Sequence, residues 1–215
     1  MDILRPNDYC MLQDYFLQLL QGYTTDTHLA SQLWQEIEGH YTGKKRYYHS
    51  LTHLEQLLQQ LLNCKDLIAD WDTVLFSLFY HDVVYNPLRQ DNEEQSAELA
   101  VNRLKALSYP LHKSATCYSQ ILATKGHQLS TENDTNLFTD ADLSMLGSSQ
   151  DAYVQYAANI RKEYAVYPDF LYKKGRAKVL QHFLQMEQIF KTTYFYERFE
   201  NQARLNLSAE LKQLQ

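Results

Sequence analysis

Apolar residues recur every three to four positions along most of the chain, which is the spacing of one face of an α-helix. Residues 9–20 and 28–37 show this spacing in its simplest form. The apolar positions of these two segments are Met11, Leu12, Tyr15, Phe16 and Leu19, and then Leu29, Leu33, Trp34 and Ile37. We predict a scaffold helix in each segment.

Two further segments have apolar patterns that indicate deeper burial. Residues 49–62 carry a wide leucine stripe. Residues 74–80 are almost continuously apolar, and the run continues through His81-Asp82 to Tyr85 before Pro87 ends it. A helix that is apolar on all sides belongs at the centre of a fold. We therefore predict that this second segment is the central helix.

The rest of the chain continues the helical pattern. Asp91 and Glu94 have the spacing of a capping box, which predicts a helix over 94–107. Further helices are predicted at 111–123, closed by Gly126, and at 150–164, 169–186 and 194–214. The polar residues 130–136 are typical of a surface loop. With only 6 Gly and 4 Pro, the sequence predicts an all-α protein with one domain over residues 1–215.

Charge and cysteine content restrict the function classes. The net charge of -6, from 20 basic and 26 acidic residues, excludes a broad basic surface for a nucleic-acid duplex, so any phosphate must be bound locally. Cys10, Cys64 and Cys117 are widely spaced, which fits reduced thiols in the cytoplasm. No apolar run approaches 18 residues, so we expect no membrane contact. The oligomeric state is open, because the final helix could pack on the core or on a second subunit.

Histidine and aspartate interrupt two of the apolar segments. His49 and His53 are four residues apart, which places them on one helical face. An ionised Asp82 among apolar neighbours would cost several kcal/mol unless it is paired or bound to a metal. A metal site explains these residues, and the alternative is that His81 and Asp82 hydrogen-bond buried backbone or cap a helix. Asp140 and Asp142 present a similar choice between helix cap and metal ligand.

The order of these residues, His, then His-Asp, then a distant Asp, resembles the HD superfamily of metal-dependent phosphohydrolases. Within it, residues 46–54, 78–87 with 91–97, and 139–147 look like a bacterial subfamily of predicted HD phosphohydrolases. The similarity continues into Arg176, 179–180 and 200–207, and so covers nearly the whole chain. The resemblance implies an HD-domain helical bundle with a metal site in its core.

A more distant similarity, to cyclic-nucleotide phosphodiesterases, suggests individual roles. Those enzymes carry Tyr-His-Asn-x-x-His, in which the second His binds metal and the first donates a proton, and their last metal Asp lies in Ala-Asp-Leu-Ser. The similarity implies that His53 is a ligand, His49 a general acid, and Asp142 rather than Asp140 the final ligand. This chain has Ser50 where those enzymes have Asn, so His49 as proton donor or as ligand stays open.

Together these residues predict a metal centre. The expected ligands are His53, His81, Asp82 and Asp142, around one or two divalent ions with Asp82 able to bridge a second. Mixed nitrogen and oxygen ligands do not select among Mn, Mg, Fe, Co, Ni and Zn. A bound ion would activate water for attack on phosphorus. We assign catalytic roles to His49, Asp82 and Glu94, although Glu94 could also serve in the capping box.

Positive groups are needed near the phosphate, and we expect them among Lys125, His127, Arg46 and Arg89. The predicted function is a metal-dependent phosphohydrolase that cleaves a phosphoester of a small metabolite, with a nucleotide as the leading candidate. Two alternatives use the same scaffold: a non-catalytic nucleotide-binding or regulatory HD module, and a di-iron oxygenase. Fold resemblance alone does not choose among them.

Overall fold

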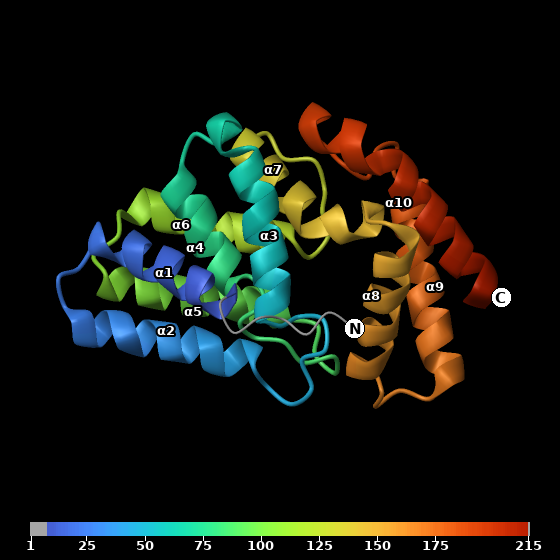
Figure 1. Ribbon diagram of the computed structural model, residues 1–215, viewed down its shortest axis with the longest axis horizontal. Coiled ribbons are helices and arrows are strands. Elements are labelled where there is room, and N and C mark those ends of the chain that lie inside the picture. Colours follow the sequence, from blue (N-terminus) through green and yellow to red (C-terminus); the bar gives the residue numbers. More distant parts are fainter. Residues whose placement is uncertain (1–7, 215) are drawn as a thin grey trace. The chain divides into compact units, whose positions relative to one another are not determined.

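The computed structural model describes the backbone of residues 8–214 and the side chains of residues 11–214. Over this range the chain forms ten α-helices and two short 3-10 helices, and no strand (Figure 1). The all-α prediction is confirmed.

Contacts along the chain divide it into two units, Met1–Gln128 and Leu129–Gln215. The first unit contains α1 (Asp8–Gln21), α2 (Thr27–Tyr41), α3 (Leu51–Asn63), η1 (Lys65–Leu67), α4 (Trp71–Tyr80), α5 (Asn92–Ala106) and α6 (Leu111–Ala123). The second contains α7 (Asn133–Leu143), η2 (Ser144–Gly147), α8 (Gln150–Glu163), α9 (Asp169–Gln185) and α10 (Thr193–Leu214). The single domain over residues 1–215 stays a prediction.

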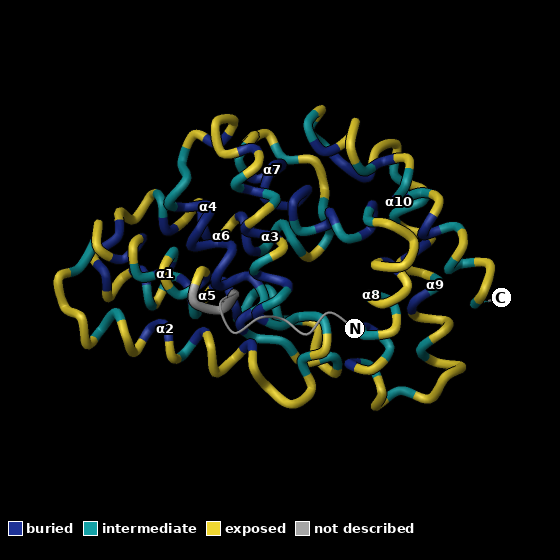
Figure 2. The backbone as a smooth tube through the Cα atoms, viewed as in Figure 1, coloured by how far each residue is buried: buried dark blue, intermediate teal, exposed yellow. Residues whose placement is uncertain are grey.

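Helix α4 is the core of the first unit. Every residue from Thr73 to Tyr80 is buried, and Figure 2 shows this helix in the colour of buried backbone. It packs against α1, α3, α5 and α6, with Phe79 in an edge-to-face contact with Phe16 at 4.8 Å between ring centroids. The continuous apolar run therefore predicted a central helix correctly.

The end of α4 differs from the prediction. The helix stops at Tyr80, His81 is its C-cap, and residues 82–91 form a non-helical segment. Side chains supply the hydrogen bonds that the helix would have made. Ser96 Oγ accepts from the N–H of Val84 at 3.1 Å and donates to its carbonyl at 3.2 Å. Asn92 does the same for Asn86, with both contacts at 3.0 Å. Asp82 thus lies just beyond the helix and not within it.

The predicted capping box at the start of α5 is wrong. Asp91 occupies the N-cap position, but its side chain makes no capping hydrogen bond to the first turn. Its carboxylate accepts from Arg89 at 2.8 and 2.6 Å and from the Gln95 side chain at 2.8 Å. The nearby arginine therefore replaces the backbone N–H groups as the partner of the acid.

The polar stretch 130–136 is only partly a loop. Helix α7 begins at Asn133, and Thr135 and Asn136 are buried. The Asn136 side chain accepts from the N–H of Ser130 at 2.9 Å and donates to its carbonyl at 2.9 Å. These bonds satisfy the loop backbone, so a polar sequence can be buried here.

Helix α10 packs on η2, α9 and α7 within the second unit. Asn206 on α10 donates to the carbonyls of Leu146 and Ser148, both at 2.9 Å. Arg176 on α9, which is buried, pairs with Glu210 on α10 through bonds of 2.8 and 2.9 Å. The final helix is therefore anchored by polar contacts as well as by its apolar side chains.

Among the described residues, no helix has both the length and the apolar character that crossing a membrane requires.

Candidate metal centre

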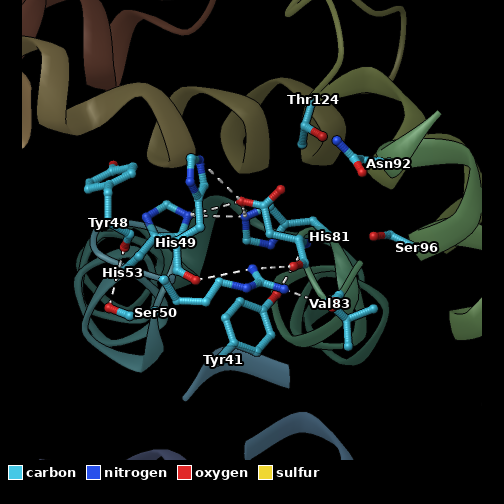
Figure 3. Close-up of polar contacts among 12 residues, drawn as sticks. Tyr41, Tyr48, His49, Ser50, His53, His81, Val83, Asn92, Ser96 and Thr124 are labelled. Carbon is cyan, nitrogen blue, oxygen red and sulfur yellow. Dashed lines mark hydrogen bonds and ion pairs between the residues drawn. The ribbon is translucent and has the colours of Figure 1, made fainter. Parts of the chain in front are cut away.

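Three predicted ligands, His53, His81 and Asp82, lie together in the first unit. His53 projects from the first turn of α3, His81 is the C-cap of α4, and Asp82 follows it. The Nε2 atoms of His53 and His81 are 3.1 Å apart. Asp82 Oδ2 lies 3.2 Å from His81 Nε2 and 3.8 Å from His53 Nε2. Figure 3 shows the imidazole rings of His53 and His81 directed at each other.

One hydrogen bond orients the His81 ring. Its Nδ1 atom lies 2.9 Å from the carbonyl oxygen of Leu78. Because a carbonyl only accepts, Nδ1 carries the proton, and a neutral ring then has its lone pair on Nε2. This arrangement is the usual one for a metal-binding histidine.

The separations between these atoms fit a divalent ion. Two ligand atoms about 2.1 Å from one ion lie roughly 3.0 Å apart at a right angle and roughly 3.4 Å apart at a tetrahedral angle. The distances from His81 Nε2 to His53 Nε2 and to Asp82 Oδ2, 3.1 and 3.2 Å, fall in this interval. The third separation, 3.8 Å between His53 Nε2 and Asp82 Oδ2, is wider and corresponds to an angle of roughly 130° at such an ion. Both histidines are buried, at 3% and 1% exposure, which limits competition from bulk water.

His49 lies beside this group of three. It precedes the N-cap Ser50 and is therefore outside α3, which begins at Leu51. Its Nε2 is 3.8 Å from Asp82 Oδ2, and its ring stacks on that of Tyr85 with centroids 4.1 Å apart. Tyr48 makes an edge contact with the same ring at 5.0 Å. This place is compatible with both roles considered for His49, proton donor and ligand.

The contacts of Asp140 explain that residue without a metal. Its side chain is fully buried in the second unit and accepts from the N–H groups of Lys191 and Thr192 at 2.9 and 2.8 Å and from the Thr192 hydroxyl at 2.7 Å. The Lys191 ammonium lies 3.3 Å away. Asp140 thus anchors the segment before α10.

Asp142 also belongs to the second unit, near the end of α7, and is half-buried. Its role as the last ligand stays a prediction.

The four residues predicted to contact substrate all lie in the first unit. Lys125 donates to the carbonyl of Gln90 at 2.7 Å and pairs with Glu94, which lowers the pKa of that carboxyl. Arg89 is exposed and pairs with Asp91. His127 has a positive φ of 49° and donates its backbone N–H to the carbonyl of Ala123. Contact between these side chains and a substrate stays a prediction.

Arg46 is engaged with backbone. Its guanidinium donates to the carbonyls of His49, Asp82 and Val83 at 3.1, 2.7 and 2.9 Å. Arg46 therefore has a structural role, bonding these carbonyls, that is an alternative to the predicted role in substrate binding.

Glu93 is a residue that the sequence pattern did not single out. It is half-buried, and burial raises its pKa, with the charges of Asp82 and Glu94 acting in the same direction and Lys125 opposing them. Lys125 Nζ lies 3.9 Å from its carboxylate. The catalytic role was assigned to the neighbouring Glu94, whereas Glu93 is the more buried of the two.

Comparison with protein-family models, curated proteins and solved structures found no match. The resemblance to HD phosphohydrolases therefore rests on the residues quoted above and stays a prediction.

Proposed function

We propose that this protein is a metal-dependent phosphohydrolase that cleaves a phosphoester of a small metabolite, with a nucleotide as the leading candidate. The observation that supports this most is the convergence of two buried imidazoles and one carboxylate, whose ligand atoms lie 3.1, 3.2 and 3.8 Å from one another. Mixed nitrogen and oxygen ligands of this kind suit a divalent transition metal.

The chain's own groups would divide the work. His53, His81 and Asp82 would hold the ion, with Asp142 as the predicted fourth ligand. When bound, a divalent ion polarises a phosphoryl oxygen and lowers the pKa of a coordinated water. His49, held between the rings of Tyr48 and Tyr85, would donate a proton to the leaving group.

The phosphate would be bound by Lys125 with His127. Lys125 now pairs with Glu94, so a phosphate would compete with that carboxylate for the ammonium. The Glu94 carboxylate, once released from Lys125, would be free to act as a base. It would lie close to Glu93, and burial raises the pKa of Glu93.

The test begins with elemental analysis of protein purified without chelator. Metal-loaded protein, supplied in turn with Mn, Co, Ni or Mg, is then assayed against an aryl phosphate and a panel of nucleotides. We expect hydrolysis of at least one substrate. In Asp82→Ala both bound metal and hydrolysis should be lost, by about 10³-fold or more for the rate, because one ligand carboxylate is removed.

The matched control is Asp66→Ala, since Asp66 is exposed in η1 of the same unit. It should retain full activity. Metal-loaded wild type that binds nucleotide but cleaves nothing would contradict the proposal in favour of the regulatory module, and iron with oxygen consumption would favour the oxygenase.

A further inference from the structure

Arg46 joins two separate segments of the first unit. It lies between α2 and α3, where its NH1 group donates to the carbonyls of His49 and Asp82 and its NH2 group donates to that of Val83. Figure 3 shows His49 and Val83, two of the residues whose carbonyls Arg46 bonds, on opposite sides of the Tyr41 ring. One of these segments leads into His53, and the other contains Asp82 and follows His81.

These three carbonyls lie outside the flanking helices α3 and α4. His49 precedes α3, and Asp82 and Val83 follow α4. A guanidinium is planar and its N–H groups have fixed directions, so one side chain that bonds three carbonyls determines how far apart they lie. The separation of the two ligand-bearing segments is thereby set at Arg46.

Two tyrosine rings hold the guanidinium in place. Its central carbon is 5.1 Å from the ring centroid of Tyr41 and 5.3 Å from that of Tyr85. The Tyr41 hydroxyl accepts from the N–H of Asp82 at 3.1 Å, and the Tyr85 ring stacks on His49. The rings that hold Arg46 therefore also contact the residues that it bridges.

We infer that Arg46 is a positioning residue that sets the geometry of the metal site, and not a group that binds the substrate phosphate. Three of its five N–H groups, two on NH1 and one on NH2, donate to backbone carbonyls, so the end of the guanidinium formed by NH1 and NH2 is committed to the backbone. The inference rests on the metal site of the proposed function, but it does not depend on which substrate is cleaved.

The test measures metal affinity in the absence of substrate. Arg46→Lys keeps the positive charge, but an ammonium is a point donor and does not reproduce the planar arrangement. We expect Mn²⁺ and Co²⁺ to bind about 10- to 100-fold more weakly, as measured by calorimetry. The visible absorption spectrum of the Co²⁺-loaded variant should also differ from that of wild type, because the ligands are displaced.

The matched control is Arg103→Lys. Arg103 lies in the same unit and makes a two-point pair with Glu36 at 2.7 and 2.6 Å. This variant should lower the unfolding temperature and leave the Co²⁺ spectrum and the affinity unchanged. A merely structural role for Arg46 would give the same result as this control and would overturn the inference.

Chemical rescue gives a second measurement. In Arg46→Ala, millimolar guanidinium should restore part of the metal affinity, and methylammonium should not. Unchanged metal affinity in Arg46→Lys together with a raised KM would assign the residue to substrate binding and would overturn the inference.

If Arg46→Lys does not fold, Tyr41→Phe provides a milder test. It removes the hydroxyl that accepts from the Asp82 N–H, and it should weaken metal binding by a smaller factor. Unchanged metal affinity in Tyr41→Phe would count against the inference. If wild type binds metal but hydrolyses no substrate, the proposed function is wrong. The metal affinities of the Arg46 and Tyr41 variants would then still test the role of Arg46. Wild type that binds no metal would overturn both.

Discussion

Single polar contacts orient several side chains near the candidate metal centre. The bond from His81 Nδ1 to the Leu78 carbonyl leaves Nε2 with its lone pair in a neutral ring, and three backbone carbonyls accept from the Arg46 guanidinium. Arg89 and Asp91 form the clearest isolated pair, with both side chains about half exposed. Arg89 lowers the pKa of Asp91 to about 2 from an ordinary value of 3.8, and Gln95 adds to the effect.

This pair makes a pH prediction. Because the pKa of Asp91 is lower in the folded state than in the unfolded chain, its contribution to stability is present above pH 4 and is lost as the pH falls from about 4 towards 2. Titration of the Asp91 carboxyl carbon by NMR should give a midpoint near 2, and Arg89→Met should move it back towards 3.8. A wild-type midpoint close to 4 would show that the pair does not persist in solution.

The buried thiol of Cys117 makes a second residue-scale prediction. Burial raises its pKa to about 12, and Ser77 Oγ lies 3.4 Å from its sulfur. Only the thiolate reacts with alkylating reagents, so this cysteine should remain unmodified in the folded protein at neutral pH. Mass spectrometry after iodoacetamide treatment, with urea-unfolded protein as the positive control, checks this. Rapid labelling of Cys117 in native protein would contradict the described burial.

At the scale of elements, the backbones of η2 and α10 approach each other closely at Gly147. A Cβ built at this position in η2 would lie 2.6 Å from the carbonyl oxygen of Phe199 on α10 and 2.8 Å from its Cα. A backbone cannot move aside as the end of a flexible side chain can. The contact between η2 and α10 therefore requires glycine.

Gly147→Ala should lower the free energy of unfolding by about 1–3 kcal/mol, because α10 must shift to make room. Gly175 is the matched control, since it lies inside α9 of the same unit and a Cβ there would meet nothing within 4 Å. Gly175→Ala should raise stability by about 0.4–1 kcal/mol through the unfolded chain. Urea denaturation followed by circular dichroism measures both changes, and equal effects of the two substitutions would contradict the packing described here.

Element identity was predictable from local pattern, whereas element ends were not. The apolar run 74–80 identifies a buried element, and the low Gly and Pro content of the chain makes a helix the expected form, as α4 is. Its end at Tyr80 depends on Tyr41, Arg46 and Ser96, which come from elsewhere in the chain and bond the backbone beyond it. The residue types pointed to a metal site, and the family resemblance implied that His53, His81 and Asp82 form one group. The structural roles of Arg46 and Asp140 depend on contacts that no local pattern contains.

At the scale of the whole molecule, the distribution of tryptophan makes the two units distinguishable. Both tryptophans, Trp34 and Trp71, lie in the first unit, as do His53, His81 and Asp82. Tryptophan fluorescence therefore reports the unit with the proposed metal site, and far-ultraviolet circular dichroism reports helices of both units.

A metal that binds only the folded state should stabilise it by about 2.7 kcal/mol at a free concentration 100 times its dissociation constant. We expect Mn²⁺ to raise the unfolding midpoint by fluorescence, and Asp82→Ala to abolish the shift. If residues 1–215 form one domain, circular dichroism should give the same midpoint and the same shift. A shift seen only by fluorescence would reject the one-domain prediction and keep the metal site.

The position of the His53, His81 and Asp82 group along the chain also has a consequence for synthesis. The last of these residues is translated 47 residues before the second unit begins at Leu129 (129 − 82 = 47). At about 5–20 residues per second, that interval lasts roughly 2–9 seconds. These candidate ligands are thus synthesised several seconds before the second unit. If they bind a metal as proposed, the ion that is abundant at that moment has the first opportunity to occupy them.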